Sequence, residues 1–273
     1  MSNLHFKVLP PQASLAKYVR RILITIGDES TNEHLPIGPT GFAYFTYSRY
    51  PIALHFSDKV IASDKQLYVA GQLDHEMPYF KIKGPFFHVG LELRPTAPFY
   101  FFGLEGLVDG GAILSEMEPK ITSAFRERFA SESDPLKVAE GLQDELKRRL
   151  DNVAPIAFLE QTLEVIYANN GNIEVNDLIN QSGLSERHFR REFKRIIGIG
   201  PKQYCKVIQF NAAFEAVQTG NEEQIYAVAL QNGYYDHAHF INDFKAILGQ
   251  SPQEFLRSDH TFLRNYLGPE GRV

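Results

Sequence analysis

Residues 183–204 read GLSERHFRREFKRIIGIGPKQY, and residues 233–255 read GYYDHAHFINDFKAILGQSPQEF. The second stretch repeats the first at a constant offset of 51 residues. The matched pairs are Phe189 and Phe240, Phe193 and Phe244, Lys194 and Lys245, Gly198 and Gly249, Pro201 and Pro252, and Tyr204 and Phe255. Gly183 and Gly233 are offset by 50 residues, which places one extra residue in the turn of the second copy. Self-similarity at a fixed offset indicates a duplicated structural unit.

Each copy predicts a helix, a tight turn and a second helix. The first helix ends at a glycine, which can adopt the positive φ needed to reverse the chain. Ser185 and Asp236 then stand where a side chain caps the second helix. This is the helix-turn-helix arrangement. The expected helices are residues 175–182 and 186–197 in the first copy, residues 225–231 and 237–248 in the second, and residues 202–219 between the copies. Further helices are expected over residues 156–169 before the first copy and 252–257 after the second.

The two copies differ in charge. Between residues 184 and 206 there are seven Lys and Arg against two Glu, a local net charge of +5 in a chain that carries -5 overall. Between residues 222 and 257 there are two Lys and Arg against five acids, a local net charge of -3. A clustered positive face is the electrostatic footprint of a protein that binds phosphates. We therefore expect DNA binding in which the first copy dominates the affinity and the second adds weaker contacts.

The repeated residues resemble the AraC/XylS family of transcription regulators over roughly residues 173–257. The second copy carries the family pattern best, at Ile225, Ala229, Gly233, Tyr234, Phe240, Phe244, Lys245, Gly249, Pro252 and Phe255. The resemblance implies that the second helix of each unit enters the major groove, with the two units about one turn of the duplex apart.

The resemblance also implies which side chains contact DNA. The base-reading positions of the family fall on Arg187, Arg190 and Arg191 in the first unit and on His237, His239 and Asn242 in the second. Arginine suits the guanine edge and asparagine the adenine edge in the major groove. The full set of expected DNA-binding residues is Ser185, Arg187, His188, Arg190, Arg191, Lys194, His237, His239, Asn242 and Lys245.

Three positions on the helices of this region are noteworthy. Ile179 stands where the first unit of the family usually has a small alanine, and Gln209 stands where the connecting helix usually has an arginine. Cys205 is the only cysteine, which excludes a disulfide within the chain and a zinc site of several cysteines. We expect Cys205 to be a small hydrophobic residue rather than a redox sensor.

The first 154 residues have the character of a β-rich domain, because short aromatic and β-branched runs alternate with turn residues. The expected strands are residues 21–26, 41–47, 52–56, 67–70 and 86–93, with a short helix over residues 15–19 and two longer helices over residues 120–132 and 135–150. The sequence thus predicts an α+β chain of two domains. The short strands of residues 1–154 predict a barrel or a sandwich, and the family resemblance implies a cupin-like barrel with helices. Residues 155–273 are expected to form an all-α domain of two helix-turn-helix units joined by a long helix.

The N-terminal domain is expected to sense a small effector or to drive dimerisation, as the family resemblance implies. A barrel can enclose a small ligand, and the expected lining is Phe42, Tyr44, Phe45, Tyr47, Phe87, His88 and Glu92. The histidine and glutamate candidates for a cupin metal site, His55, His75, Glu76 and His88, lack the required spacing. We expect no metal and no cofactor. No nucleophile motif or phosphate-binding loop is present, so an enzyme is not expected.

These patterns together favour a sequence-specific DNA-binding transcription regulator. Its expected partners are double-stranded DNA, a small effector, RNA polymerase and a second copy in a homodimer. No run of residues is long and apolar enough for a membrane span, so we expect a cytoplasmic protein without a membrane partner. Two alternatives stay open. One is an interaction scaffold with a degenerate DNA-binding module, which the acidic second copy favours, and the other is an enzyme fused to a DNA-binding domain.

Overall fold

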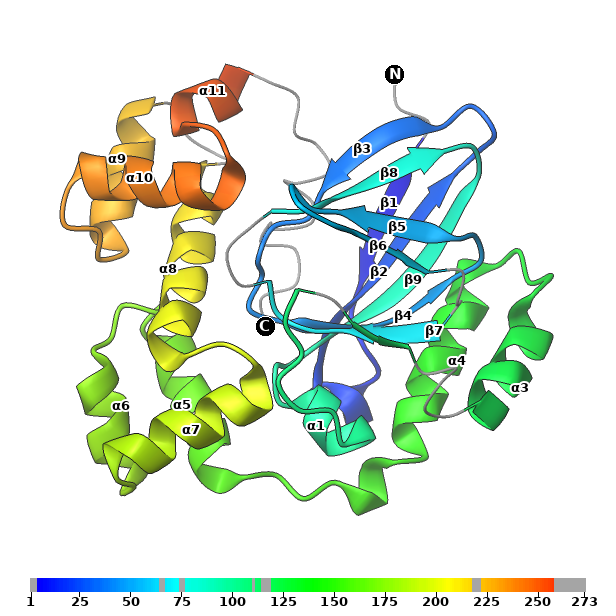
Figure 1. The fold of residues 1–273 in the computed structure, drawn as a ribbon, viewed down its shortest axis with the longest axis horizontal. Helices are drawn as coiled ribbons and strands as arrows, with labels where there is room; N and C mark the ends of the chain where they lie inside the picture. Colours follow the sequence, from blue (N-terminus) through cyan, green and yellow to red (C-terminus); the bar gives the residue numbers. More distant parts are fainter. Residues whose placement is uncertain are drawn as a thin grey trace.

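The structure is a computed structural model that describes residues 4–63, 67–73, 77–109, 111–113, 119–217 and 222–257. Two antiparallel β-sheets with their covering helices form one side of the molecule, and the helices that follow residue 156 form the other (Figure 1). The predicted α+β class, with a β-rich N-terminal half and a helical C-terminal half, is confirmed.

The larger sheet has the strand order β1-β2-β9-β4-β7-β10, and the smaller sheet has the order β3-β8-β5-β6. The strands of the larger sheet are β1 (His5–Leu9), β2 (Val19–Gly27), β9 (Phe86–Leu93), β4 (Ala43–Ser48), β7 (Leu67–Ala70) and β10 (Gly111–Ile113). Those of the smaller sheet are β3 (Asn32–Pro36), β8 (Tyr79–Lys83), β5 (Ile52–His55) and β6 (Val60–Ser63). The named strands that pair do so in antiparallel fashion.

The alternation of side chains along β9 separates the two faces of the larger sheet. Phe87, Val89 and Leu91 are buried in the core that the helices cover. His88 lies on the opposite face, where its ring is 6.2 Å from that of Phe80 in β8. Side chains of this second face therefore meet the smaller sheet.

Helices of the N-terminal half cover the first face of the larger sheet. They are η1 (Ala13–Leu15), α1 (Ala97–Phe102), α3 (Pro119–Phe129), α4 (Pro135–Lys147) and η2 (Leu150–Asn152). Helix α4 begins after Asp134, whose carboxylate accepts a hydrogen bond from the backbone N–H of Leu136 at 2.9 Å. Val138, Leu142 and Leu146 recur at helical spacing and are fully buried against the sheet.

The C-terminal half is built around one long helix, α8 (Pro201–Val217), with a group of shorter helices at each of its ends (Figure 1). The first group is α5 (Ala157–Ala168), α6 (Val175–Ser182) and α7 (Glu186–Ile197). The second is α9 (Glu222–Gln231), α10 (His237–Leu248) and α11 (Pro252–Arg257). No helix of the described part is long and apolar enough to cross a membrane.

The core of the second helical group is continuous with the β-rich half. Phe210, Phe214 and Phe244 share one buried cluster with Leu23 of β2 and Ile37, which follows β3. The first group has its own cluster around Phe189 and Phe193. Helix α8 thus contributes to both helical cores and also packs on the N-terminal half.

Most predicted elements are confirmed, and the misses are local. The predicted strand over residues 67–70 and the helices over residues 175–182, 186–197, 237–248 and 252–257 match the observed bounds. The short helix predicted over residues 15–19 is misplaced, because Ala13–Leu15 form the helical turn and Val19 already pairs with Leu93 in the sheet. The sequence did not predict β1, β3, β6, β8, β10 or α1.

Candidate nucleic-acid interface and ligand pocket

Both helical groups reverse the chain at a glycine. Gly183, between α6 and α7, has φ +68°, and Gly233, between α9 and α10, has φ +84°. Both values lie in the left-handed region, where a side chain adds strain. A Cβ on Gly233 would also overlap Asn172, whereas a Cβ on Gly183 would meet no atom within 4 Å. The two turns predicted from the repeat are confirmed, and the second is the more tightly enclosed.

The paired phenylalanines hold each second helix against its own core. Phe189 and Phe193 of α7 are fully buried, and Phe193 meets Tyr204 edge to face at 5.8 Å. Phe240 and Phe244 of α10 are buried in the same way. Because one face of each helix is fixed inward, the opposite face is presented to solvent.

The two second helices differ at their N-terminal caps. The Asp236 carboxylate accepts a hydrogen bond from the backbone N–H of His239 at 2.8 Å, so this predicted cap is confirmed. Ser185 occupies the matching position of α7, but its side chain makes no capping hydrogen bond. That part of the prediction is wrong. Ser185 is exposed, so its hydroxyl can bond to water instead of the helix end.

The outward face of α7 carries the predicted cations. Arg187, His188, Arg191 and Lys194 are exposed, and Arg190 is half-buried. Arg190 pairs with Glu186 at 2.8 Å, and Arg191 pairs with Glu192 at 3.1 Å. Exposed pairs of this kind contribute only about 0–1 kcal/mol. A phosphate or a base edge can therefore compete for either guanidinium at little energetic cost.

The outward face of α10 has less positive charge. His237, Asn242 and Lys245 are exposed, and His239 is half-buried. His239 Nε2 lies 3.6 Å from the Asp243 carboxylate. The predicted side chains of both units thus lie together on one exposed face of each helix, and the structure places an acid among those of the second.

One exposed residue at this face was not predicted. Tyr235 directly precedes the Asp236 cap and has 89% of its surface exposed. A phenol in this place can donate to a phosphate oxygen. The signal in the sequence was the mismatch with the first copy, which has Leu184 at the corresponding position.

The two departures from the family pattern have clear structural roles. Ile179 of α6 is buried in the core of the first group, together with Leu178 and Phe189. Gln209 of α8 donates a hydrogen bond from its amide to the carbonyl of Asn232 at 2.9 Å, in the turn before Gly233. Gln209 therefore ties the connecting helix to the second unit.

Helix α8 is hydrogen-bonded to the loop before β4. The Tyr204 hydroxyl donates to the Gly41 carbonyl at 2.9 Å, and the Asn211 amide donates to the carbonyls of Pro39 and Thr40 at 3.1 Å each. All of these groups are buried, where satisfied hydrogen bonds hold a fixed geometry. The helix that joins the two units is therefore fastened to the β-rich half.

A second contact reaches the C-terminal end of α7. Arg195 forms an ion pair with Glu105, in the loop after α1, and its guanidinium lies over the ring of Phe99 at 5.3 Å. Gly106 of the same loop lies beside the last carbonyls of α7. The N-terminal half thus contacts a helix that carries predicted DNA-binding residues.

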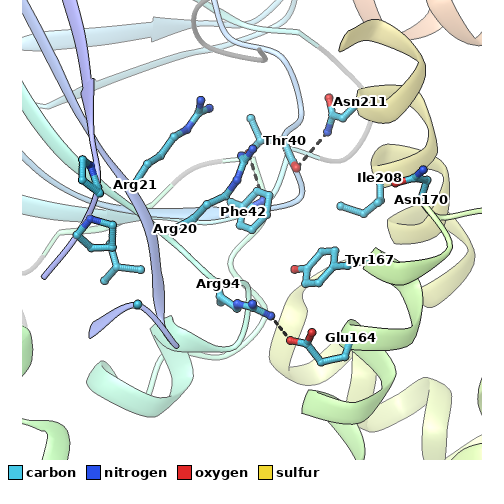
Figure 2. Close-up of a pocket in the computed structure, with 14 residues that line it drawn as sticks. Arg20, Arg21, Thr40, Phe42, Arg94, Glu164, Tyr167, Asn170, Ile208 and Asn211 are labelled. Carbon is cyan, nitrogen blue, oxygen red and sulfur yellow. Dashed lines mark hydrogen bonds and ion pairs between the residues drawn. The ribbon is translucent and has the colours of Figure 1, made fainter. Parts of the chain in front are cut away.

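Six of the seven residues predicted to line an effector pocket lie on the two faces of the larger sheet, and the seventh, Phe42, directly precedes β4. Phe45, Tyr47 and Phe87 belong to the core under the helices. Tyr44, His88 and Glu92 lie on the opposite face: Tyr44 donates to Glu92 at 2.8 Å, and His88 is hydrogen-bonded to the Tyr68 hydroxyl at 2.8 Å. Phe42 lines a cavity of about 440 Å³ between the β-rich half and helices α5 and α8 (Figure 2).

Two titratable groups on this second face of the larger sheet, the half-buried His88 and the buried Glu92, have shifted pKa values. Burial lowers the pKa of His88 to about 4, so His88 is neutral near pH 7. Burial alone would raise the pKa of Glu92, but the guanidinium groups of Arg21 and Arg20 and their hydrogen bonds hold it below its usual value. Glu92 therefore remains a carboxylate that balances part of the charge of the two arginines.

The remaining residues to consider are Cys205, the candidate redox sensor, and the candidate metal ligands. Cys205 is buried in α8, and burial raises the pKa of its thiol to about 12, so it is a protonated hydrophobic side chain near pH 7. Within the described ranges, no group of three or more His, Cys, Asp or Glu residues could hold a metal ion. Of the metal candidates, His75 and Glu76 lie outside the described residues. His55 stacks on Tyr79 at 5.1 Å.

A family model described as a helix-turn-helix domain matches residues 178–258. An uncharacterised HTH-type transcriptional regulator of Haemophilus influenzae is 30% identical over 122 residues, which are 44% of this chain and 38% of the relative. The HTH-type transcriptional activator AarP of Providencia stuartii is 30% identical over 87 residues, which are 32% of this chain and 64% of AarP. The chain thus matches less than two thirds of the length of both relatives.

Among solved structures, ToxT from Vibrio cholerae aligns with a TM-score of 0.49 and 10% sequence identity, over 94% of this chain and 98% of ToxT.

Proposed function

We propose that this chain, which carries an AraC-type helix-turn-helix domain over residues 178–258, is a transcription regulator that binds specific double-stranded DNA with both of its helix-turn-helix units. The observation that carries the proposal is the repeated geometry. In each unit a left-handed glycine leads into a helix with a buried phenylalanine pair and an exposed polar face. Helix α8 joins the two units and fixes their separation.

The charges of the two units support an unequal division of labour. On α7, Arg187, Arg190 and Arg191 supply most of the phosphate attraction and the guanine readout. Residues 222–257, which include α10, carry a local net charge of -3, so the second unit attracts phosphates weakly. The second unit therefore refines specificity and adds little affinity.

We also propose that residues 1–154 form the sensing and dimerisation domain and residues 155–273 the DNA-binding domain. The contacts of α8 with Pro39, Thr40 and Gly41, and of Arg195 with Glu105, give a route by which the first domain can influence the second. A second copy and RNA polymerase are the further partners that this role requires. No catalytic step is part of the proposal.

Selection of bound sequences from a random pool of duplex DNA tests the proposal. We expect an enriched site with two conserved blocks about one helical turn apart, one for each recognition helix. Wild-type protein and an Arg187→Ala variant should enrich different sequences at one block only. An unenriched pool would contradict sequence-specific binding.

The acidic second unit favours one alternative, an interaction scaffold that has lost DNA binding. The two functions differ in the effect of salt. A DNA-binding protein that neutralises phosphates loses affinity for DNA steeply as salt rises, because counterions are released on binding. A scaffold that has lost DNA binding would show no DNA affinity that falls as salt rises.

A further inference from the structure

The cavity of about 440 Å³ lies at the junction of the two halves (Figure 2). Arg20, Phe42 and Arg94 line it from the β-rich half, and Tyr167 of α5 and Ile208 of α8 line it from the helical half. Its volume falls within the range of small-molecule sites. A ligand in this position would touch both halves at once.

The residues around the cavity carry a net positive charge. Arg21 and Arg20 share one carboxylate, that of Glu92, at 2.6 Å and 2.9 Å. Arg94 pairs with Glu164 of α5. Three guanidinium groups thus face two carboxylates, counted over the lining residues and Glu92. One positive charge is left over, which a single anion would balance.

Two of these arginines have donors to spare. The side chain of Arg20 is 14% exposed and that of Arg94 is 26% exposed. Among the described residues, each makes one side-chain hydrogen bond, Arg20 to Glu92 and Arg94 to Glu164. A guanidinium has five N–H donors in a planar fork. Most donors of both arginines are therefore left to water or to a ligand.

Aromatic rings hold the two guanidinium groups in place. Arg20 lies over Phe42 at 4.6 Å, and Arg94 lies over Tyr167 at 5.3 Å. The rings of Phe42 and Tyr167 are themselves nearly parallel, with centroids 6.0 Å apart. Stacking uses the flat face of a guanidinium and leaves its in-plane N–H groups free for a carboxylate. With Ile208 beside them, the rings offer apolar contact to the body of an organic molecule.

Glu164 is the weak member of this arrangement. Its side chain is 64% exposed, and an ion pair so open to water contributes little. The carboxylate of a ligand presents the same two oxygens to Arg94. We propose that the cavity binds a small organic acid with an apolar body, and that its carboxylate displaces Glu164 from Arg94 and bonds to Arg94 and Arg20.

Such a ligand would act directly on the helices of the DNA-binding half. Releasing Glu164 removes an ion pair between α5 and the β-rich half. Contact of the ligand with Ile208 adds an apolar contact to α8. The ligand thereby changes how the helical half is held. The site itself is independent of the proposed function, whereas this effect on DNA rests on it.

Calorimetric titration of the full chain tests the site. The probes are phenylacetate and hexanoate, with phenylacetamide as the neutral match and inorganic phosphate as the anion without an apolar body. We expect at least one of the two acids to bind with one site per chain, and the amide and phosphate to bind at least about tenfold more weakly. Binding of neither acid, or equal binding of acid and amide, would overturn the proposal.

Three variants localise the binding. Arg94→Met should weaken binding of the acid about tenfold to hundredfold, the loss expected for a charge-assisted hydrogen bond. Glu164→Gln should tighten binding of the acid by up to about fivefold, because the competing carboxylate is gone. Arg128→Met is the matched control, since Arg128 is an exposed arginine stacked on Phe129 at 4.7 Å outside the cavity, and it should change nothing.

The outcomes separate the site from its regulatory effect. The site would be overturned if Arg94→Met bound the acid as tightly as the wild type and unfolded at the same temperature. It would also be overturned if Glu164→Gln bound the acid more weakly than the wild type. DNA affinity is measured in parallel on the ligand-free chain. Acid binding without DNA binding would refute the proposed function and leave the site standing, and DNA binding without acid binding would do the reverse.

Discussion

The hydroxyl of Tyr204 donates a hydrogen bond to the carbonyl oxygen of Gly41 at 2.9 Å, from the start of α8 to the loop before β4. The same hydroxyl lies 2.7 Å from that of Tyr167 in α5. Because its single proton goes to Gly41, Tyr204 accepts the proton of Tyr167. Burial raises the pKa of Tyr204 well above its usual value, so the donor stays protonated. One buried side chain thus joins two helices of the DNA-binding half to the β-rich half.

Tyr204→Phe should lower the free energy of unfolding by about 1–3 kcal/mol, since it leaves the Gly41 carbonyl and the Tyr167 hydroxyl without their partner while the ring still fills its place. Urea denaturation measures the change. Tyr235→Phe is the control, because Tyr235 is 89% exposed and its substitution should have no effect. Equal values for the two variants would contradict the role of Tyr204.

Substitutions on the two recognition helices should have unequal effects on DNA. Arg190→Ala or Arg191→Ala should abolish detectable binding to the selected site, with a loss of at least about tenfold, because each removes a cation from the affinity-bearing unit. His239→Ala should only weaken binding, because the second unit, with a local net charge of -3 over residues 222–257, adds little phosphate attraction. Gel-shift titration compares the variants. Equal losses would refute the ranking of the two units.

The two turn glycines should differ in their tolerance of alanine. Gly183→Ala should cost about 1–2 kcal/mol of unfolding free energy, the strain of a side chain in the left-handed region. Gly233→Ala should cost more, because its new Cβ also overlaps Asn172. Thermal unfolding measures both. An Asn172→Ala substitution should bring the cost of Gly233→Ala close to that of Gly183→Ala, and a lack of rescue would count against this contact.

His88 should make the fold sensitive to acid. The pKa of His88 is about 4 in the folded chain against an ordinary 6.5, so between these values the unfolded chain binds a proton that the folded chain does not. Stability is therefore fully present above pH 6.5 and falls as the pH drops toward 4, by about 3 kcal/mol in all.

His88→Gln isolates this effect, because glutamine keeps a hydrogen-bonding group for Tyr68 but does not titrate. Urea unfolding of both proteins across this pH range gives the comparison. The lowered pKa of Glu92 affects both proteins alike and cancels in the difference. Parallel stability curves for the two proteins would show that His88 is not responsible.

The helical half could be predicted from the sequence because its information is local. A glycine with a positive φ, a pair of phenylalanines four residues apart and a following proline determine where α6, α7, α10 and α11 begin and end. The repeat adds the relation between the two units. The Ser185 cap failed because several side-chain and solvent partners can satisfy a helix end, and sequence does not rank them.

The smaller sheet and the cavity could not be predicted in this way. Strand β3 (Asn32–Pro36) has the sequence NEHLP, without an apolar alternation, and its pairing with β8 depends on residues about 50 positions away. The cavity brings together Arg20, Arg94 and Tyr167, which no motif connects. Alternation along β4 and β9 places three of the seven predicted lining residues, Phe45, Tyr47 and Phe87, in the helix-covered core.

The most direct test of the central claim is a fluorescence anisotropy titration of the full chain against its selected DNA site and a scrambled duplex, repeated over a series of salt concentrations. We expect the selected site to bind at least about a thousandfold more tightly than the scrambled one at the same salt. The logarithm of each affinity should fall linearly with the logarithm of salt. Equal affinity for the two duplexes, or binding that does not change with salt, would contradict a sequence-specific DNA-binding regulator.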